Sequence, residues 1–186
     1  MPLILFNKPF QVMSQFSAHP ERETLADYIE IPAIYPAGRL DADSEGLLLL
    51  TDDGKLQHAI SHPRRKQPKT YLAQVEGTVS PEVLERLRNP LDLGDFVTQR
   101  SDARLIEEPA WLWPRNPPIR ERRHQPTSWI ALTIGEGKNR QVRRMTAAVG
   151  LPTLRLVRIT IGPFSLATHP VLPGEWREVD PLELER

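Results

Sequence analysis

Apolar residues along this chain occur in short runs separated by turn-forming residues, which predicts many strands and few, short helices. Four consecutive leucines at 47–50 follow Gly46 and precede the Asp-Asp-Gly sequence of residues 52–54. A run this short between turn signals is typical of a buried strand. The run Leu3–Phe6 predicts another strand, which ends at the Asn-Lys-Pro sequence of residues 7–9.

Alternation of apolar and polar residues predicts a further strand at 70–77. It places Tyr71, Ala73 and Val75 on one face, and on this pattern alone Tyr71 is a core residue. Further strands are expected at 96–97, 103–106, 129–134 and 154–161.

Helical spacing of apolar residues is confined to short stretches at 24–30, 55–60, 81–88 and 140–149. Ser80 is expected to cap the third of these helices, with Pro81 at its first position. Asn139 is expected to cap the fourth, and Gly150 to end it. Many strands with a few short helices predict an α+β fold, with a mostly antiparallel sheet and helices packed against it.

The composition bounds the class of protein. A chain of 186 residues fits a single domain, here expected to comprise two small subdomains that share a core. The absence of a membrane-span-length apolar run, of a signal peptide and of cysteine predicts a soluble cytoplasmic protein without disulfides or thiolate metal sites. The formal net charge is zero, so any argument for a polyanionic partner depends on where the charges lie.

Acidic residues are concentrated just before the leucine run. Asp41, Asp43 and Glu45 stand on a predicted loop that a buried strand would hold in place. Loops positioned by a rigid scaffold often carry catalytic residues. From residue types alone, a solvated turn explains this segment equally well. A calcium loop explains it less well, because the glycine and the distal glutamate of such a loop are misplaced.

The sequence Gly-Arg-Leu-Asp at 38–41, followed by Ser-Glu-Gly-Leu-Leu-Leu-Leu-Thr-Asp-Asp-Gly at 44–54, resembles the catalytic motif of bacterial ribosomal-RNA pseudouridine synthases of the RsuA family. The resemblance implies that Asp41 is the nucleophile. A common form of the motif has threonine where Ser44 stands, a change that keeps the hydroxyl group.

Two later segments resemble the other motifs of this family. Lys69–Tyr71 is similar to the second motif, whose tyrosine lies near the target base, and a tyrosine can stack on uracil or exchange a proton. Lys138–Met145 is similar to the third motif. In the wider family an arginine two residues after the glutamine of this motif keeps the nucleophile ionised, which implies Arg143 after Gln141.

The resemblance also implies a fold and a reaction. The fold is the pseudouridine synthase catalytic fold, with a curved sheet, flanking helices and a central cleft. Because the first strand begins at Leu3, no S4-type RNA-binding domain is expected before it; this indicates the branch of the family without that domain, or a chain trimmed at its N-terminus. The implied protein is a monomeric isomerase that converts a specific uridine of large-subunit ribosomal RNA to pseudouridine.

The implied reaction uses an aspartate nucleophile and base flipping, and it requires no cofactor and no metal. Attack on C1′, addition to the pyrimidine ring and a glycal route all remain open.

Basic residues outside the catalytic set are expected to bind the RNA. The segment 107–128 combines arginines, prolines, Trp111 and Trp113 without any period, which favours an RNA-contacting or mobile loop, although a solvated hairpin loop is equally compatible. The expected RNA contacts are Lys8, Arg39, Arg64, Arg65, Lys69, Arg115, Arg120, Arg122, Arg123, Lys138, Arg140, Arg144 and Arg155.

Two alternatives of other classes remain. A non-catalytic RNA-binding or ribosome-assembly module would use the same basic residues, but it has no need of Asp41, which would repel phosphate. A glycosidase-like hydrolase would pair Asp41 with Asp43 or Glu45. These three residues are so close in sequence that a pair straddling a sugar is awkward to build.

Overall fold

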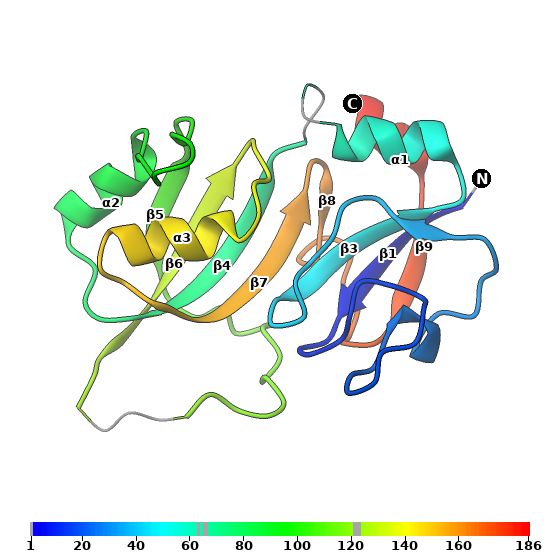
Figure 1. Ribbon diagram of the computed structural model, residues 1–186, viewed down its shortest axis with the longest axis horizontal. Coiled ribbons are helices and arrows are strands. Elements are labelled where there is room, and N and C mark those ends of the chain that lie inside the picture. The colour runs from blue at the N-terminus through cyan, green and yellow to red at the C-terminus, as the bar shows by residue number, and fades with distance from the viewer. Residues whose placement is uncertain (1, 63, 65–66, 121–123) are drawn as a thin grey trace. The chain divides into compact units, whose positions relative to one another are not determined.

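The computed structural model describes residues 2–62, 64, 67–120 and 124–186. The chain forms two compact units: unit 1 comprises the chain up to Gln67 together with Arg158–Arg186, and unit 2 comprises Pro68–Val157. The strands are β1 (Leu3–Lys8), β2 (Tyr35–Pro36), β3 (Glu45–Thr51), β4 (Lys69–Glu76), β5 (Asp102–Ile106), β6 (Thr127–Ile134), β7 (Thr153–Ile161), β8 (Phe164–Ser165) and β9 (Trp176–Val179) (Figure 1). The α-helices are α1 (Gly54–Ser61), α2 (Pro81–Arg88) and α3 (Gln141–Ala148), and short 3-10 helices occupy Leu25–Asp27 and Pro181–Glu185.

In unit 1, β1 lies antiparallel between β3 and β9, and β2 pairs with the other edge of β3 (Figure 1). Every residue of β1 and β3 is buried. On one face, Leu48 and Leu50 pack with Phe6 and with the apolar residues of segment 25–34. Burial of both faces explains why the leucine run has no polar alternation. The predicted strands at 3–6 and 47–50 are thus confirmed.

The start of β3 requires glycine at position 46. Gly46 has a φ of +107°, a backbone conformation that residues with a Cβ rarely adopt. An added Cβ would lie 2.2 Å from the backbone oxygen of Arg158. Gly46 therefore lets β3 approach the backbone at residue 158 closely, at the point where the acidic loop joins the strand.

In unit 2, β4 and β5 both pair antiparallel with β6. Helices α2 and α3 cover one face of these strands, as Figure 1 shows. The buried core there includes Ala73 and Val75 of β4, Leu87 of α2, and Val142 and Met145 of α3. The helices predicted at 55–60 and 81–88 are confirmed, with Asp53 and Ser80 as N-caps. The chain then runs from unit 2 into unit 1 along β7.

Two predicted elements are wrong. The helix expected at 24–30 is a single 3-10 turn capped by Thr24, because Tyr28 leaves the helical backbone and packs its ring on Phe6 at a centroid distance of 5.8 Å. The strand expected at 96–97 is one isolated bridge between Asp92 and Val97, since a tight turn closes between them. None of the helices in the described ranges is long and apolar enough to cross a membrane.

Candidate active site

The loop that carries Asp41 is fixed by backbone hydrogen bonds within unit 1. Before Asp41, the N–H of Ala37 donates to the carbonyl of Leu49 in β3 at 2.8 Å. After it, the N–H of Ser44 donates to the carbonyl of Asp41 at 3.0 Å, which closes a turn. Leu40 is buried, whereas Asp41 is half-buried. The candidate nucleophile is therefore accessible on a loop whose neighbours are held by the core.

The buried side chain of Lys8 contacts this acidic loop. Its ammonium group donates to the carbonyls of Pro9 and Val12, both at 2.8 Å, and to that of Ala42 at 3.4 Å. Burial lowers the pKa of Lys8 to about 7, opposed by the carboxylates of Glu45, Asp43 and Asp41. The RNA contact predicted for Lys8 is corrected here: its side chain is fully buried and bound to carbonyls, so this conformation does not present it to a phosphate.

Two further residues, which the sequence pattern did not indicate, contact the loop. The hydroxyl of Ser14 donates to the carbonyl of Leu40 at 2.7 Å and accepts from the N–H of Leu40 at 3.2 Å. The backbone N–H of Gln11 donates to the carbonyl of Ala42 at 2.6 Å. No local sequence signal marks either contact, because each joins segments about thirty residues apart.

Tyr71 lies in unit 2, on β4 opposite Leu132 of β6. Its side chain is half-buried and packs against the unit 2 core. The preceding residue, Thr70, is tied to Thr133 by a hydrogen bond between their hydroxyl groups at 2.8 Å. Tyr71 thus contributes to the unit 2 core and is also partly exposed.

The three arginines of α3 and its N-terminus have different surroundings. The guanidinium of Arg144 bonds to both carboxylate oxygens of Asp95 and to the carbonyl of Leu93, and it lies 5.4 Å from the centre of the Phe96 ring. The hydrogen bond from Arg144 holds the pKa of Asp95 below its usual value. Arg143 is half-buried and Arg140 is exposed. Arg144 therefore serves to fasten α3 to the 91–99 segment.

The N-terminus of α3 differs from the prediction. The N-cap is Arg140, in the left-handed region with a φ of 52°, and not Asn139. The buried side chain of Gln141 accepts from the N–H of Lys138 at 3.1 Å and donates to the carboxylate of Glu136 at 2.8 Å. The side chain of Gln141, inside the helix, thus accepts the hydrogen bond from the turn before α3, and Asn139 does not cap the helix.

In the 107–128 segment, the residues before β6 form no strand or helix within the described part, and 127–128 already belong to β6. Two predicted RNA contacts, one in this segment and one in β7, donate to protein carbonyls. Arg115 donates to the carbonyl of Leu154 at 3.3 Å, and Arg155 donates to that of Trp113 at 2.8 Å. Arg155 is also buried, which corrects its assignment to the RNA surface. This reciprocal pair ties the long loop to the first residues of β7.

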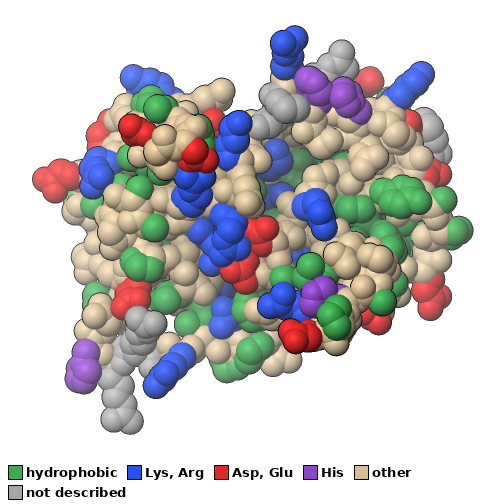
Figure 2. All heavy atoms as spheres, viewed as in Figure 1, with side chains coloured by type: hydrophobic (Ala, Val, Ile, Leu, Met, Phe, Trp, Pro, Cys, Tyr) green, Lys and Arg blue, Asp and Glu red, His purple; other side chains and the backbone are tan. Residues whose placement is uncertain are grey.

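Other predicted RNA contacts remain accessible. Figure 2 shows lysine and arginine side chains interspersed with acidic ones on the viewed face. Lys69 is half-buried at the start of β4. The predicted contacts Arg65, Arg122 and Arg123 lie outside the described residues. The exposed ones are Arg39, Arg64, Arg120, Lys138 and Arg140.

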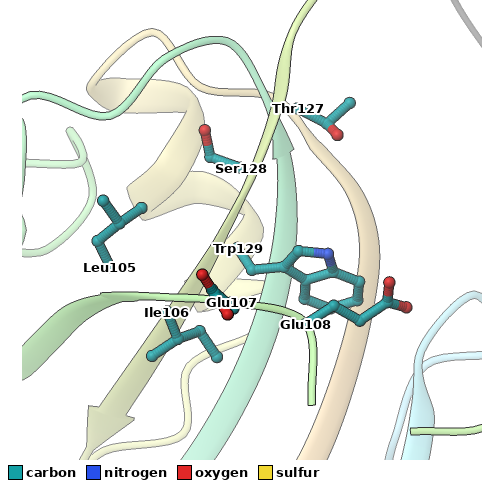
Figure 3. A pocket seen from close by; sticks show the side chains of 7 residues that line it. All are labelled: Leu105, Ile106, Glu107, Glu108, Thr127, Ser128 and Trp129. Carbon is teal, nitrogen blue, oxygen red and sulfur yellow. The ribbon is translucent and has the colours of Figure 1, made fainter. Parts of the chain in front are cut away.

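An open pocket of about 490 Å³ lies in unit 2 where β5 ends and β6 begins. In Figure 3 the indole of Trp129 lies between the carboxylates of Glu107 and Glu108. Two carboxylates would repel RNA phosphates, and none of the predicted catalytic residues lines this pocket. Its lining residues are Leu105, Ile106, Glu107, Glu108, Thr127, Ser128 and Trp129.

The sequence and the fold were compared with known proteins. The RNA pseudouridylate synthase family matches residues 2–148. Over 180 residues, the chain is 53% identical to ribosomal large subunit pseudouridine synthase E of Xanthomonas campestris pv. campestris, which corresponds to 96% of this chain and 95% of that protein. A protein of the same name from Vibrio vulnificus is 51% identical over 177 residues, or 95% of this chain and 74% of that protein.

Among solved structures, the crystal structure of a pseudouridylate synthase has a TM-score of 0.80 to this fold at 26% identity, and the match covers 99% of this chain and 72% of that chain. The fold expected from the three motifs is thereby confirmed.

Proposed function

We propose that this protein, which belongs to the RNA pseudouridylate synthase family, isomerises a uridine of large-subunit ribosomal RNA to pseudouridine. The observation that carries this proposal is the 53% identity to a large-subunit pseudouridine synthase over nearly the full length of both chains. In the reaction the C1′–N1 bond breaks, the uracil turns, and a C1′–C5 bond forms. We place the activity in the cytoplasm, where bacteria, the source of both named relatives, transcribe ribosomal RNA.

Asp41 supplies the nucleophilic carboxylate. A carboxylate in a site that excludes water drifts towards its neutral, unreactive form unless a cation pairs with it. Arg143 fills that role in the RNA complex, because a guanidinium stays protonated and grips a carboxylate with two parallel donors. This assignment is supported by the position of Arg143 two residues after Gln141, and by the engagement of Arg144 with Asp95.

Tyr71 stacks on the flipped uracil or moves the proton from C5. The partial exposure of Tyr71 supports this role. The exposed cations near the N-terminus of α3, Lys138 and Arg140, hold phosphates of the deformed RNA. A uridine inside a stacked strand is out of reach of a side-chain carboxylate, so these contacts must stabilise the flipped state.

The test compares Asp41→Ala with Asp43→Ala on transcripts of large-subunit ribosomal RNA, with pseudouridine, free uracil and RNA affinity measured for each. Asp41→Ala should abolish pseudouridine formation and leave the Kd roughly intact, while Asp43→Ala should be much milder. Near-normal turnover by Asp41→Ala would refute the nucleophile. Equal losses in both variants, with free uracil released by the wild type, would favour the hydrolase.

The same assay tests the different roles proposed for Arg143 and Arg140. Arg143→Leu should lower turnover more than affinity, because its proposed partner is the nucleophile. Arg140→Leu should lower affinity more than turnover, because its proposed partner is a phosphate. The opposite ranking would show that the roles along α3 are exchanged. Wild-type protein that binds the RNA tightly but forms no pseudouridine in any large-subunit transcript would favour the non-catalytic module.

A further inference from the structure

The residues on both sides of Asp41, Leu40 and Ala42, are held through backbone groups by one segment of unit 1, residues 8–14. On the N-terminal side, the Ser14 hydroxyl satisfies both backbone groups of Leu40, donating to its carbonyl at 2.7 Å and accepting from its N–H at 3.2 Å. Ser14 is only 4% exposed, so water has little access to these bonds. One small side chain thus fixes the position of the residue before the candidate nucleophile.

On the C-terminal side, the carbonyl of Ala42 receives two donors. They are the backbone N–H of Gln11 at 2.6 Å and the ammonium of Lys8 at 3.4 Å. Gln11 has a φ of 66°, in the left-handed region that residues with a side chain rarely adopt. Its backbone is therefore held in an unfavourable conformation while its N–H bonds to the loop.

We propose that Ser14 is a positioning residue for Asp41, which it serves by anchoring Leu40 while Gln11 anchors Ala42. This inference rests on the proposed function of Asp41. Each residue has only two soft backbone dihedrals, so anchoring the neighbours of Asp41 on both sides, Leu40 and Ala42, restricts where its Cβ points. Displacement of a reacting group by about 1 Å can cost about a hundredfold in rate. Of the contacts described on both sides, the Ser14 hydroxyl is the one that a conservative substitution can remove without changing charge.

The experiment measures single-turnover rate, RNA Kd and Tm for Ser14→Ala and Ser17→Ala, on a transcript that the wild type modifies. Ser17 is exposed three residues after Ser14, so its replacement controls for loss of a hydroxyl in this part of the chain. We expect Ser14→Ala to lower the rate by about 10- to 100-fold with the Kd within about twofold, and Ser17→Ala to match the wild type. An unchanged rate for folded Ser14→Ala would overturn the proposal, as would a loss confined to the Kd.

Two more variants separate positioning from general destabilisation. Ser14→Cys keeps a group of similar size that is a weaker donor and acceptor, so its rate should lie between those of Ser14→Ala and the wild type. If Ser14→Ala does not fold, a wild-type rate for Ser14→Cys overturns the proposal. Ile29→Val loosens the unit 1 core away from the loop. When each variant is assayed at an equal interval below its own Tm, Ile29→Val should retain the wild-type rate, and an equal loss there would overturn the proposal.

Asp41→Ala, assayed in parallel, separates the positioning role of Ser14 from the nucleophilic role of Asp41. An inactive Asp41→Ala with a fully active Ser14→Ala refutes the positioning role alone. An active Asp41→Ala refutes the proposed nucleophile, whatever Ser14→Ala does.

Discussion

Replacement of Gly46 by alanine should strongly destabilise unit 1. The φ of +107° at this position is strained for any residue with a Cβ, at a cost of about 1–2 kcal/mol. The new Cβ would also lie 2.2 Å from the Arg158 oxygen and 3.0 Å from its nitrogen. These atoms are backbone and cannot rotate away, so the two segments must separate, a distortion of the kind that costs about 1–3 kcal/mol when a packed interior is overfilled. We expect the free energy of unfolding to fall by about 2–5 kcal/mol, out of a typical total of about 5–15 kcal/mol.

Urea unfolding of matched glycine variants separates strain from steric overlap. Gly150 has a φ of +80° with open space around its Cβ position, so Gly150→Ala reports backbone strain alone. Gly54 begins α1 without a positive φ and also has open space, so Gly54→Ala should stabilise by about 0.4–1 kcal/mol. The expected order of stability is Gly54→Ala, wild type, Gly150→Ala, Gly46→Ala. Equal losses for Gly46→Ala and Gly150→Ala would refute the argument from close approach.

Two other perturbations test the buried cation and the long loop. Burial lowers the folded pKa of Lys8 to about 7, whereas an unfolded lysine stays protonated up to about pH 10.5. The unfolded state therefore binds more protons between these pH values. Between pH 7 and 9 the free energy of unfolding of the wild type should rise, relative to that of Lys8→Met, by up to about 1.4 kcal/mol per pH unit. Parallel profiles of stability against pH for the two proteins would contradict this. Deletion of residues 118–124 keeps the contacts of Arg115 and Trp113 with β7. It should weaken RNA binding and make the RNA Kd depend less on salt concentration. An unchanged salt dependence would show that this part of the loop makes no phosphate contact.

The elements that were predicted correctly depend on local physics. The leucine run of β3 needs only burial on both faces, and the Ser-Pro start of α2 needs only a hydroxyl beside the first turn. The start of α3 was missed because its turn is closed from a distance. Glu136 accepts from the Gln141 side chain and also from the backbone N–H of Gln99. The helix-capping preference of asparagine, from which Asn139 was predicted as the N-cap, depends on local residues and cannot predict the contact between Glu136 and Gln99.

The buried cations were misassigned for a related reason. Lysine and arginine are mostly surface residues, so each one in a family that binds RNA is naturally counted as a phosphate contact. Lys8 and Arg155 are held in the interior by backbone carbonyls. Every residue has a backbone carbonyl, so the sequence does not indicate which residues will bind these two side chains. A cation already bound to carbonyls and closed to solvent releases no counterion when RNA binds. Arg115 and Arg144 likewise donate hydrogen bonds to backbone carbonyls of the protein. We therefore propose that RNA binding depends on fewer cations than the sequence offers, and that the exposed residues Lys138 and Arg140, at the start of α3, are among them.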